Sequence, residues 1–297
     1  MHVKASGTWL RQAGEKNIFV EVDAAAIRRT LDLAPESLEF TGHPRPSIET
    51  AFHAVIRNKF VIHTHSVGAI ALSAVLDSEK TLLKDRLADF RWCWIPYVKP
   101  GYLVALEILK GEPADVYVLQ NHGVVFGADT IEQTKELISS FEEAVRPAAR
   151  TSGADPDTAL LRSALESGPA AAFALPEREC IHQLALDEET MKFASGGVLY
   201  PDHAVYLGDE IIVISPEQLK KGEFDESGKF LIVAGAGVLA RRDLNEAALD
   251  MLDALYQVAS RIPSGSRVGY LSPDSVRELL DWDAEKYRQK LIQENKT

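Results

Sequence analysis

The chain has 297 residues, of which 46% are hydrophobic and 26% are charged, and its formal net charge is −12. This composition is typical of a globular protein with one large domain or two ordinary domains. The excess of acidic residues, with no block of Lys or Arg, argues against nucleic acid and anionic membrane surfaces as partners.

The location expected for the chain is the cytoplasm. Its two cysteines, Cys93 and Cys180, lie far apart, which predicts no disulfide framework and fits a reducing compartment. The first residues lack the apolar core of a signal peptide. No run approaches the roughly 18 apolar residues of a membrane span.

The first half of the chain predicts alternating strands and helices. Residues 1–23 predict a strand, a turn at 6–8 and a second strand, and residues 24–33 predict a helix. Ser47 is expected to cap the next helix, whose buried face begins at Ile48. Further strands are expected at 60–65, 116–119 and 124–126, and further helices at 102–110 and after Thr130, which forms a capping box with Gln133.

A domain boundary is expected near residues 147–156, where Ala, Ser, Gly, Asp and Pro cluster. We therefore predict one domain at 1–150 and a C-terminal α/β domain at 151–297. Residues 230–233 should form a buried strand, and residues 245–258 a helix with one apolar stripe. The segment 230–262 resembles 117–149, with Ala236 in the place of His122. The second domain is thus a candidate degenerate repeat, although strand-turn-helix units also resemble each other by chance.

The same segment contains the pattern Gly235-x-Gly237-x-x-Ala240, which would bind a dinucleotide if it joined a strand to a helix. Only about 57 residues follow it, too few for the paired βαβαβ halves of such a fold. We regard a dinucleotide site as the weaker interpretation.

Three histidines at the ends of predicted strands carry most of the chemical information. His63 and His65 are two apart, so they share one face at the end of a strand. His122 follows a second apolar run and precedes Gly123, which permits a tight turn. An isolated His-x-His pair is more often a chance pair in a core strand. The third His favours a metal site, because three imidazoles with an open fourth position are typical of catalytic zinc.

Glu49 is the candidate general acid or base. It opens the helix that leads into the His63–His65 strand, and a short helix can return its first turn towards the end of the next strand. The alternative is a simple charge at a helix N-terminus. His53, one turn later, is expected to be a core imidazole or a support for the site.

The sequence resembles the class II aldolase/adducin family over about residues 1–147. The resemblance rests on the combined order and spacing of the motifs Val3-Lys4-Ala5-Ser6-Gly7-Thr8, Arg45-Pro46-Ser47-Ile48-Glu49-Thr50-x-x-His53, His63-Thr64-His65, Ile95-Pro96-Tyr97-x-x-Pro100-Gly101 and Leu119-Gln120-Asn121-His122-Gly123-Val124. The second half, with Tyr200-Pro201-Asp202-His203, most resembles the aldolase part of bifunctional rhamnulose-phosphate aldolase/dehydrogenase proteins.

The resemblance implies a three-layer α/β/α sandwich around a largely antiparallel sheet, assembled as a homo-oligomer, commonly a tetramer. It implies that His63, His65 and His122 bind a divalent metal, usually zinc, and that Glu49 is the catalytic carboxylate. Ser6, Gly7 and Ser47 fall where relatives bind the substrate phosphate, a role suited to a turn and a helix N-terminus. Ile48 departs from relatives that carry a second Ser there.

The leading functional hypothesis is a metal-dependent lyase of the aldolase type, which cleaves a small ketose or ketose phosphate through a metal-stabilised enediolate. An epimerase, dehydratase or decarboxylase in the same site is the alternative within enzymes. A non-catalytic, adducin-like binding module is the alternative outside them. His203 is a candidate substrate contact, although a surface or hydrogen-bonded core His is the commoner role.

Overall fold

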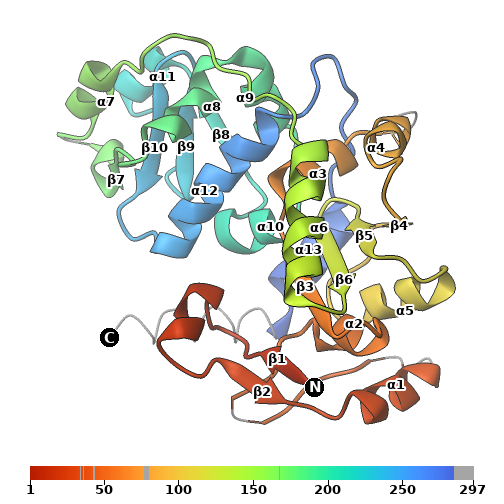
Figure 1. Cartoon of the computed structure of the whole chain (residues 1–297). Helices are drawn as coiled ribbons and strands as arrows, with labels where there is room; N and C mark the ends of the chain where they lie inside the picture. The colour runs from red at the N-terminus through yellow and green to blue at the C-terminus, as the bar shows by residue number, and fades with distance from the viewer. Residues whose placement is uncertain (34, 36, 43, 77–79, 167, 284–297) are drawn as a thin grey trace. The chain divides into compact units, whose positions relative to one another are not determined.

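The computed structural model describes all residues except 34, 36, 43, 77–79, 167 and 284–297 (Figure 1). The described residues form two compact units. The first contains Met1–Thr64, Leu87–Glu143 and 281–283, and the second contains His65–Arg86 and Ala144–Leu280. The units therefore alternate along the chain. The two domains expected from the sequence, 1–150 and 151–297, stay a prediction. Within the described residues, no helix is both long enough and apolar enough to cross a bilayer.

The first unit is built on a sheet with the strand order β3-β6-β5-β4. The β3/β6 and β6/β5 pairs are antiparallel and β5/β4 is parallel, so the sheet is largely antiparallel. The small β1/β2 pair is separate and antiparallel. In chain order the elements are β1 His2–Lys4, η1 Leu10–Gly14, β2 Phe19–Glu21, α1 Ala24–Asp32, α2 Thr50–Val55, β3 Phe60–Thr64, β4 Trp92–Ile95, α5 Tyr102–Lys110, β5 Val116–Leu119, β6 Gly123–Ala128 and α6 Ile131–Ala144.

Successive side chains of β6 point to opposite faces of the sheet, so they pack against different helices. Val125 belongs to a buried cluster with side chains of α1, α2 and α5, among them Leu31, Phe52 and Ile108. Its neighbour Phe126 instead contacts Phe141 of α6, with ring centroids 5.1 Å apart. Helices therefore cover both faces of the sheet.

The second unit is built on a sheet with the order β7-β10-β9-β8. Phe230–Val233 is fully buried, as predicted, and the predicted helix runs from Glu246 to Ala259 with Asn245 as its N-cap. In chain order the elements are α3 Val67–Ser73, α4 Lys80–Arg86, α7 Thr158–Ala164, η2 Pro169–Ala172, β7 Phe173–Ala174, η3 Glu179–His182, α8 Gln183–Leu186, α9 Glu188–Ser195, α10 Pro201–Leu207, β8 Ile212–Ile214, α11 Pro216–Lys221, β9 Phe230–Val233, β10 Gly237–Arg241, α12 Glu246–Ala259 and α13 Pro273–Leu280.

The two sheets share their strand order and strand directions. The outer pairs β3/β6 and β7/β10 are antiparallel, the hairpins β5/β6 and β9/β10 are antiparallel, and β4/β5 and β8/β9 are parallel. The hairpin loops also match, because Leu119 pairs with Gly123 and Val233 pairs with Gly237 across three residues. The middle residues, Asn121 and Gly235, both have positive φ angles, 54° and 72°. This common topology supports the predicted repeat, which stays a prediction.

The dinucleotide interpretation of Gly235–Ala240 is wrong. Gly237 begins strand β10, which turns back antiparallel to β9, so the glycine pattern joins two strands of a hairpin and no helix begins there. A phosphate-binding pattern of this kind needs the glycines to lead directly into a helix N-terminus.

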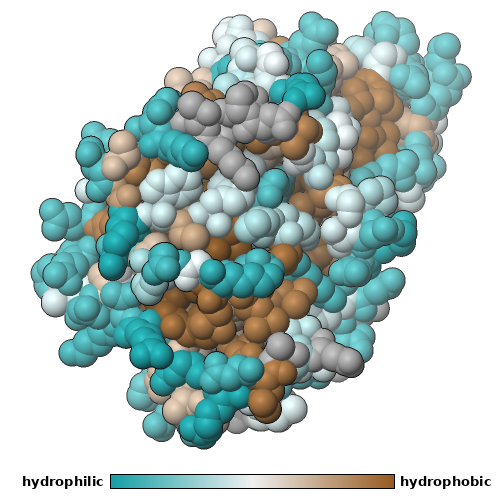
Figure 2. Space-filling model, turned by 90° about the vertical axis from the view of Figure 1, so that its right-hand side faces the viewer, coloured by the Kyte–Doolittle hydropathy of each residue, from teal (hydrophilic) through white to brown (hydrophobic). Residues whose placement is uncertain are grey.

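Some apolar side chains reach the surface. Figure 2 shows one face on which hydrophobic residues gather in patches among hydrophilic ones. The exposed large hydrophobic residues are Leu10, Phe19, Leu33, Leu109 and Ile131 in the first unit, and Leu76, Leu82 and Val213 in the second. No described feature identifies a partner for them, so the homo-oligomer stays a prediction.

Gly68 lets α3 pack closely inside the second unit, and we expect Gly68→Ala to destabilise the protein. A Cβ at Gly68 would lie 2.0 Å from the carbonyl oxygen of Val145, so two backbone segments would have to separate. We expect a loss of about 1–3 kcal/mol or more in the free energy of unfolding, measured by denaturant titration. Gly14→Ala is the matched control, because a Cβ there has open space. Equal unfolding midpoints for the two variants would contradict this packing.

Candidate metal centre

His63 and His122 come from adjacent antiparallel strands of the first unit. His63 lies in β3 opposite Val125 of β6, and its Nδ1 is 3.0 Å from the carbonyl oxygen of Val124. Because a carbonyl oxygen only accepts, Nδ1 carries the proton and Nε2 presents its lone pair. The His63 and His122 rings are 5.0 Å apart between centroids.

A tight loop holds His122 in place. Its backbone N–H donates to the carbonyl of Leu119 at 3.1 Å, and the loop turns through Asn121 at φ 54°. Asn121 is the one non-glycine residue with positive φ among the described residues, and Asn tolerates this conformation better than most side chains. His122 is buried, with 5% of its surface exposed.

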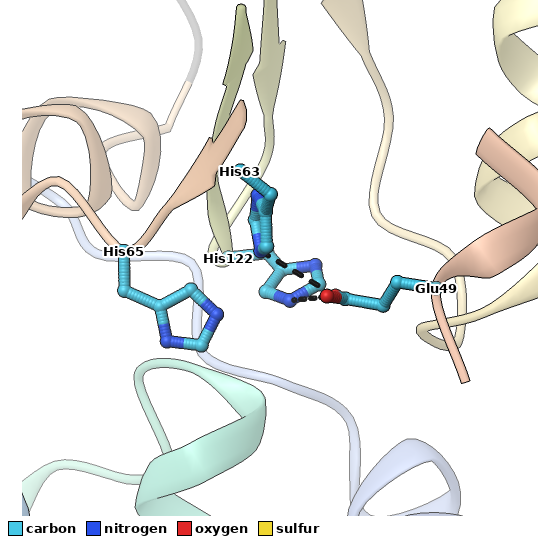
Figure 3. Close-up of side chains that lie close together, drawn as sticks. All are labelled: Glu49, His63, His65 and His122. Carbon is cyan, nitrogen blue, oxygen red and sulfur yellow. Dashed lines mark ion pairs between the residues drawn. The ribbon is translucent and has the colours of Figure 1, made fainter. Parts of the chain in front are cut away.

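Glu49 points its carboxylate at both of these rings. It is the N-cap residue of α2, which begins at Thr50, two residues later than the predicted Ile48. Its Oε1 lies 3.4 Å from His63 Nε2 and 3.5 Å from His122 Nε2 (Figure 3). The short helix thus returns Glu49 to the end of β3, as the sequence predicted.

His65 completes the group. It follows the last paired residue of β3, Thr64, and is the most exposed member. The donor atoms of Glu49, His63, His65 and His122 all lie within 4.8 Å of one another. Figure 3 shows the four side chains directed towards a common point.

The donor set fits a zinc ion. In a tetrahedral site with zinc–nitrogen bonds of about 2.1 Å, neighbouring donor atoms lie roughly 3.4 Å apart. The Glu49 distances to His63 and His122 match this spacing. Three imidazoles and one carboxylate are ligands that zinc prefers, and a carboxylate can yield its position to a substrate.

His53 lies beside this group as a neutral ring. Burial, above all, lowers its pKa to about 4, against an opposing effect of the Glu49 charge. A neutral His53 adds no positive charge next to the candidate ligands. This agrees with its predicted role as a supporting imidazole.

The structure also pairs the short segments that carry Ser6 and Ser47. Ala5 and Pro46 form an isolated antiparallel bridge, flanked by hydrogen bonds from Ser6 N to Arg45 O at 2.8 Å and from Ser47 N to Lys4 O at 3.0 Å. Gly7 turns the chain with φ 74°. The hydroxyl of Ser47 accepts from the N–H of Glu49 at 3.3 Å. Phosphate binding by Ser6, Gly7 and Ser47 stays a prediction.

A cavity of about 310 Å³ lies in the first unit next to this bridge. Arg45, Pro46 and Ile48, which flank Ser47, form part of its wall, together with Lys99. The ammonium of Lys99 lies 4.6 Å above the ring of Trp282. Two cationic side chains therefore stand beside the loop that carries Ser47.

His203 is placed inside the second unit. It is fully buried in α10, its Nδ1 accepts from the N–H of Leu199 at 3.2 Å, and burial lowers its pKa to about 3. Its neighbour Asp202 instead lies against His65, with 3.2 Å between Asp202 Oδ2 and His65 Nδ1. The substrate contact predicted for His203 stays a prediction.

We expect His203 to make the protein less stable in acid. The folded-state pKa is below the usual value of 6.5, so the unfolded chain binds more protons between pH 6.5 and 3. Stability is therefore lost as the pH falls through 6.5, with a slope approaching about 1.4 kcal/mol per pH unit.

His203→Asn keeps an acceptor for the Leu199 N–H and cannot take up this proton. Unfolding free energies measured from pH 7 to pH 4 should fall less steeply in this variant than in the wild type. Parallel curves would show that His203 does not titrate in this way.

Sequence reasoning missed Asp202 as part of this region. It named the adjacent His203 as a candidate substrate contact and assigned no role to the carboxylate. The available signal was the order Tyr200-Pro201-Asp202: Pro201 opens α10, and Asp202 follows in its first turn. The partner, His65, is far away in the sequence.

Comparisons with known proteins concern the first half of the chain. Residues 1–148 match the family model described as the Class II Aldolase and Adducin N-terminal domain. A curated protein, the "Uncharacterized oxidoreductase YuxG" of Bacillus subtilis (strain 168), is 36% identical over 107 residues. The match covers 34% of this chain and 15% of that protein, so this chain spans a small part of its relative's length.

A solved structure is also similar, the "Structure of the N-terminal Class II Aldolase domain of a conserved protein from Thermoplasma acidophilum". The sequence identity is 22%, the TM-score is 0.32, and the match covers 46% of this chain and 60% of that chain. The residues that match the family model, 1–148, contain both helices and strands.

Proposed function

We propose that the chain is a zinc-dependent lyase of the aldolase type, acting on a small ketose or ketose phosphate. The observation that carries the proposal is the position of Glu49, whose Oε1 lies 3.4 Å and 3.5 Å from the Nε2 atoms of His63 and His122 in the group of four. Three His ligands leave a coordination position open for a substrate. A carboxylate that can leave the group and take part in proton transfer suits catalysis.

His63, His65 and His122 would hold the metal. When bound, a divalent metal supplies Lewis-acid stabilisation of negative charge on the substrate's carbonyl oxygen. The residues of the chain position the metal ligands and transfer the proton. The Val124 carbonyl fixes the tautomer of His63, and the Leu119–Gly123 loop fixes His122.

Glu49 would move a proton at the nucleophilic carbon. Cleavage breaks the bond between the carbon next to the ketone and the adjacent carbinol carbon. The electron pair of that bond stays on the carbon next to the ketone, and the carbinol gives its O–H proton to water as it becomes an aldehyde. The carbon next to the ketone then takes a proton from the Glu49 carboxyl, which regains one from water. The backbone N–H of Glu49 is held by Ser47, so substrate binding and proton transfer share one loop.

A phosphate on the substrate would be bound near Ser6, Gly7 and Ser47. The support is the Ala5–Pro46 bridge, which pairs the segments that carry the two serines, and the positive charge of Arg45 and Lys99 in the adjacent cavity. The net charge of −12 would not attract an anion, so such a substrate needs this local site.

The fold details implied by the resemblance belong to the same proposal. Helices α2 and α5 on one face of the first sheet and α6 on the other support the three-layer α/β/α arrangement. The identical strand orders of the two sheets support residues 151–297 as a degenerate repeat, in which Ala236 stands in the place of His122. We also propose a homo-oligomer, and the family resemblance suggests a tetramer.

A screen of ketose phosphates and free ketoses, with and without added zinc, tests the proposal. We expect zinc-dependent release of an aldehyde from at least one ketose. Formation of an epimer or a dehydrated product would instead identify the epimerase or dehydratase alternative, and release of carbon dioxide a decarboxylase. Purified protein with far less than one metal per chain, and without any turnover, would favour the non-catalytic binding module.

A further inference from the structure

Asp202 lies against the outer nitrogen of His65. Both residues belong to the second unit, and Asp202 Oδ2 is 3.2 Å from His65 Nδ1. The exposed side-chain fractions are 15% for Asp202 and 33% for His65, so Asp202 is the more shielded of the two. The contact joins residues far apart in the sequence.

The geometry of an imidazole makes this contact informative. Its two nitrogens point in different directions, and a carboxylate oxygen only accepts. Asp202 therefore favours the tautomer with hydrogen on Nδ1, which leaves the lone pair on Nε2. Figure 3 shows one nitrogen of His65 facing the other three labelled side chains and the other facing away from them.

His63 is oriented by the same principle with a different acceptor. Its Nδ1 faces the carbonyl oxygen of Val124, held by the β3/β6 ladder. His65 lies one residue beyond Thr64, the last residue of the β3/β6 register. At its Nδ1 stands the carboxylate of Asp202, where His63 has a backbone carbonyl.

Asp202 is well placed to orient the His65 ring. It follows Tyr200 and Pro201 in the sequence and lies in the first turn of α10. The helix also contains the buried residues His203 and Leu207. A carboxylate on the outer nitrogen also makes an imidazole a stronger ligand than a carbonyl does, because its charge stabilises the positive charge shared with a metal.

We propose that Asp202 is a positioning residue for the metal centre, which sets the tautomer and direction of His65. The inference rests on the proposed function, because it assumes that His65 binds the metal. It gives Asp202 a role through His65, the residue of its own unit that it contacts. The charge of Asp202 and its distance from the His65 ring are the two features that matter.

Zinc affinity of Asp202→Asn tests the inference, measured by competition with a chromophoric chelator. We expect a loss of about 10–100-fold relative to wild type. Asp209→Asn is the matched control, because Asp209 is exposed just beyond α10 and its replacement changes the net charge equally. Asp202→Glu should recover part of the lost affinity. Thermal unfolding of the metal-free proteins should be alike, which separates positioning from general stability.

A second measurement uses no metal. Nitrogen NMR of the metal-free protein labelled at histidine reports the tautomer of each neutral ring, and His65→Gln identifies the His65 signals. We expect the Nδ1–H tautomer in the wild type and a shift towards Nε2–H in Asp202→Asn.

The outcomes distinguish this inference from the function on which it rests. Wild-type protein that binds zinc, with Asp202→Asn binding it within about threefold as tightly, would overturn the inference alone. A dominant Nε2–H tautomer of His65 in the wild type would do the same. Wild-type protein that binds no zinc would overturn the proposed function and the inference together.

Discussion

Glu49→Gln should abolish turnover while the protein keeps its metal. Glutamine matches glutamate in size and keeps an oxygen that can face His63 and His122, but it cannot exchange a proton at the substrate carbon. Removing a general acid or base costs typically about 10²–10⁴-fold in rate. We expect a loss of kcat in this range on whichever ketose the screen identifies, with KM changed much less.

The control for this variant is Glu112→Gln, which removes the same charge from an exposed position. Metal content and the unfolding midpoint should be unchanged in the control and close to wild type in Glu49→Gln. Retained turnover in Glu49→Gln would exclude Glu49 as the proton-transfer group. Simultaneous loss of metal and activity would instead make Glu49 a ligand whose charge the metal requires.

His122→Ala should remove the metal without unfolding the chain. The imidazole is one of three candidate His ligands and is almost fully buried, so few alternative donors can replace it. Loss of one ligand should weaken zinc binding by more than the roughly 100-fold that loss of a supporting partner can cost. Chelator competition and metal content after dialysis measure the effect.

We expect His122→Ala to fold, because a second hairpin of the chain already has alanine at the equivalent position. The β9/β10 hairpin has the same three-residue loop as the β5/β6 hairpin, and it carries Ala236 where the first has His122. Ala236 N also donates to the carbonyl of Val233, as His122 N does to Leu119. Alanine thus suits this backbone. A His122→Ala protein that keeps stoichiometric, tightly bound zinc would show that His122 is not a ligand.

Local pattern was enough to find the candidate ligands. The spacing of two residues along a strand means that the side chains of His63 and His65 point to the same face. A glycine after an apolar run marks the turn at His122. Glu49 followed from its place at the start of a helix that leads into the His strand. These are short-range relations, and the structure brings the four residues together.

Features that depend on distant pairing could not be found this way. Strand β4, with Trp92 and Trp94 half-buried, was not predicted, because its one partner is the parallel strand β5 and a crossover helix separates the two. The apolar segment after His65 was recognised, but no local signal shows that α3 packs with residues beyond 144. The contact of Asp202 with His65 is of the same kind.

The alternation of the two units along the chain has a consequence for synthesis. Helix α3 is made early, but it belongs to the second unit, where Gly68 lies against Val145 and Val75 pairs with Val268. Val268 follows Val75 by roughly 190 residues, which a ribosome adding about 5–20 residues per second needs on the order of 10–40 s to make. For that time Val75 lacks Val268, whereas Val145, which lies against Gly68, is made earlier. The interval is long enough for a chaperone or another nascent chain to bind the segment first.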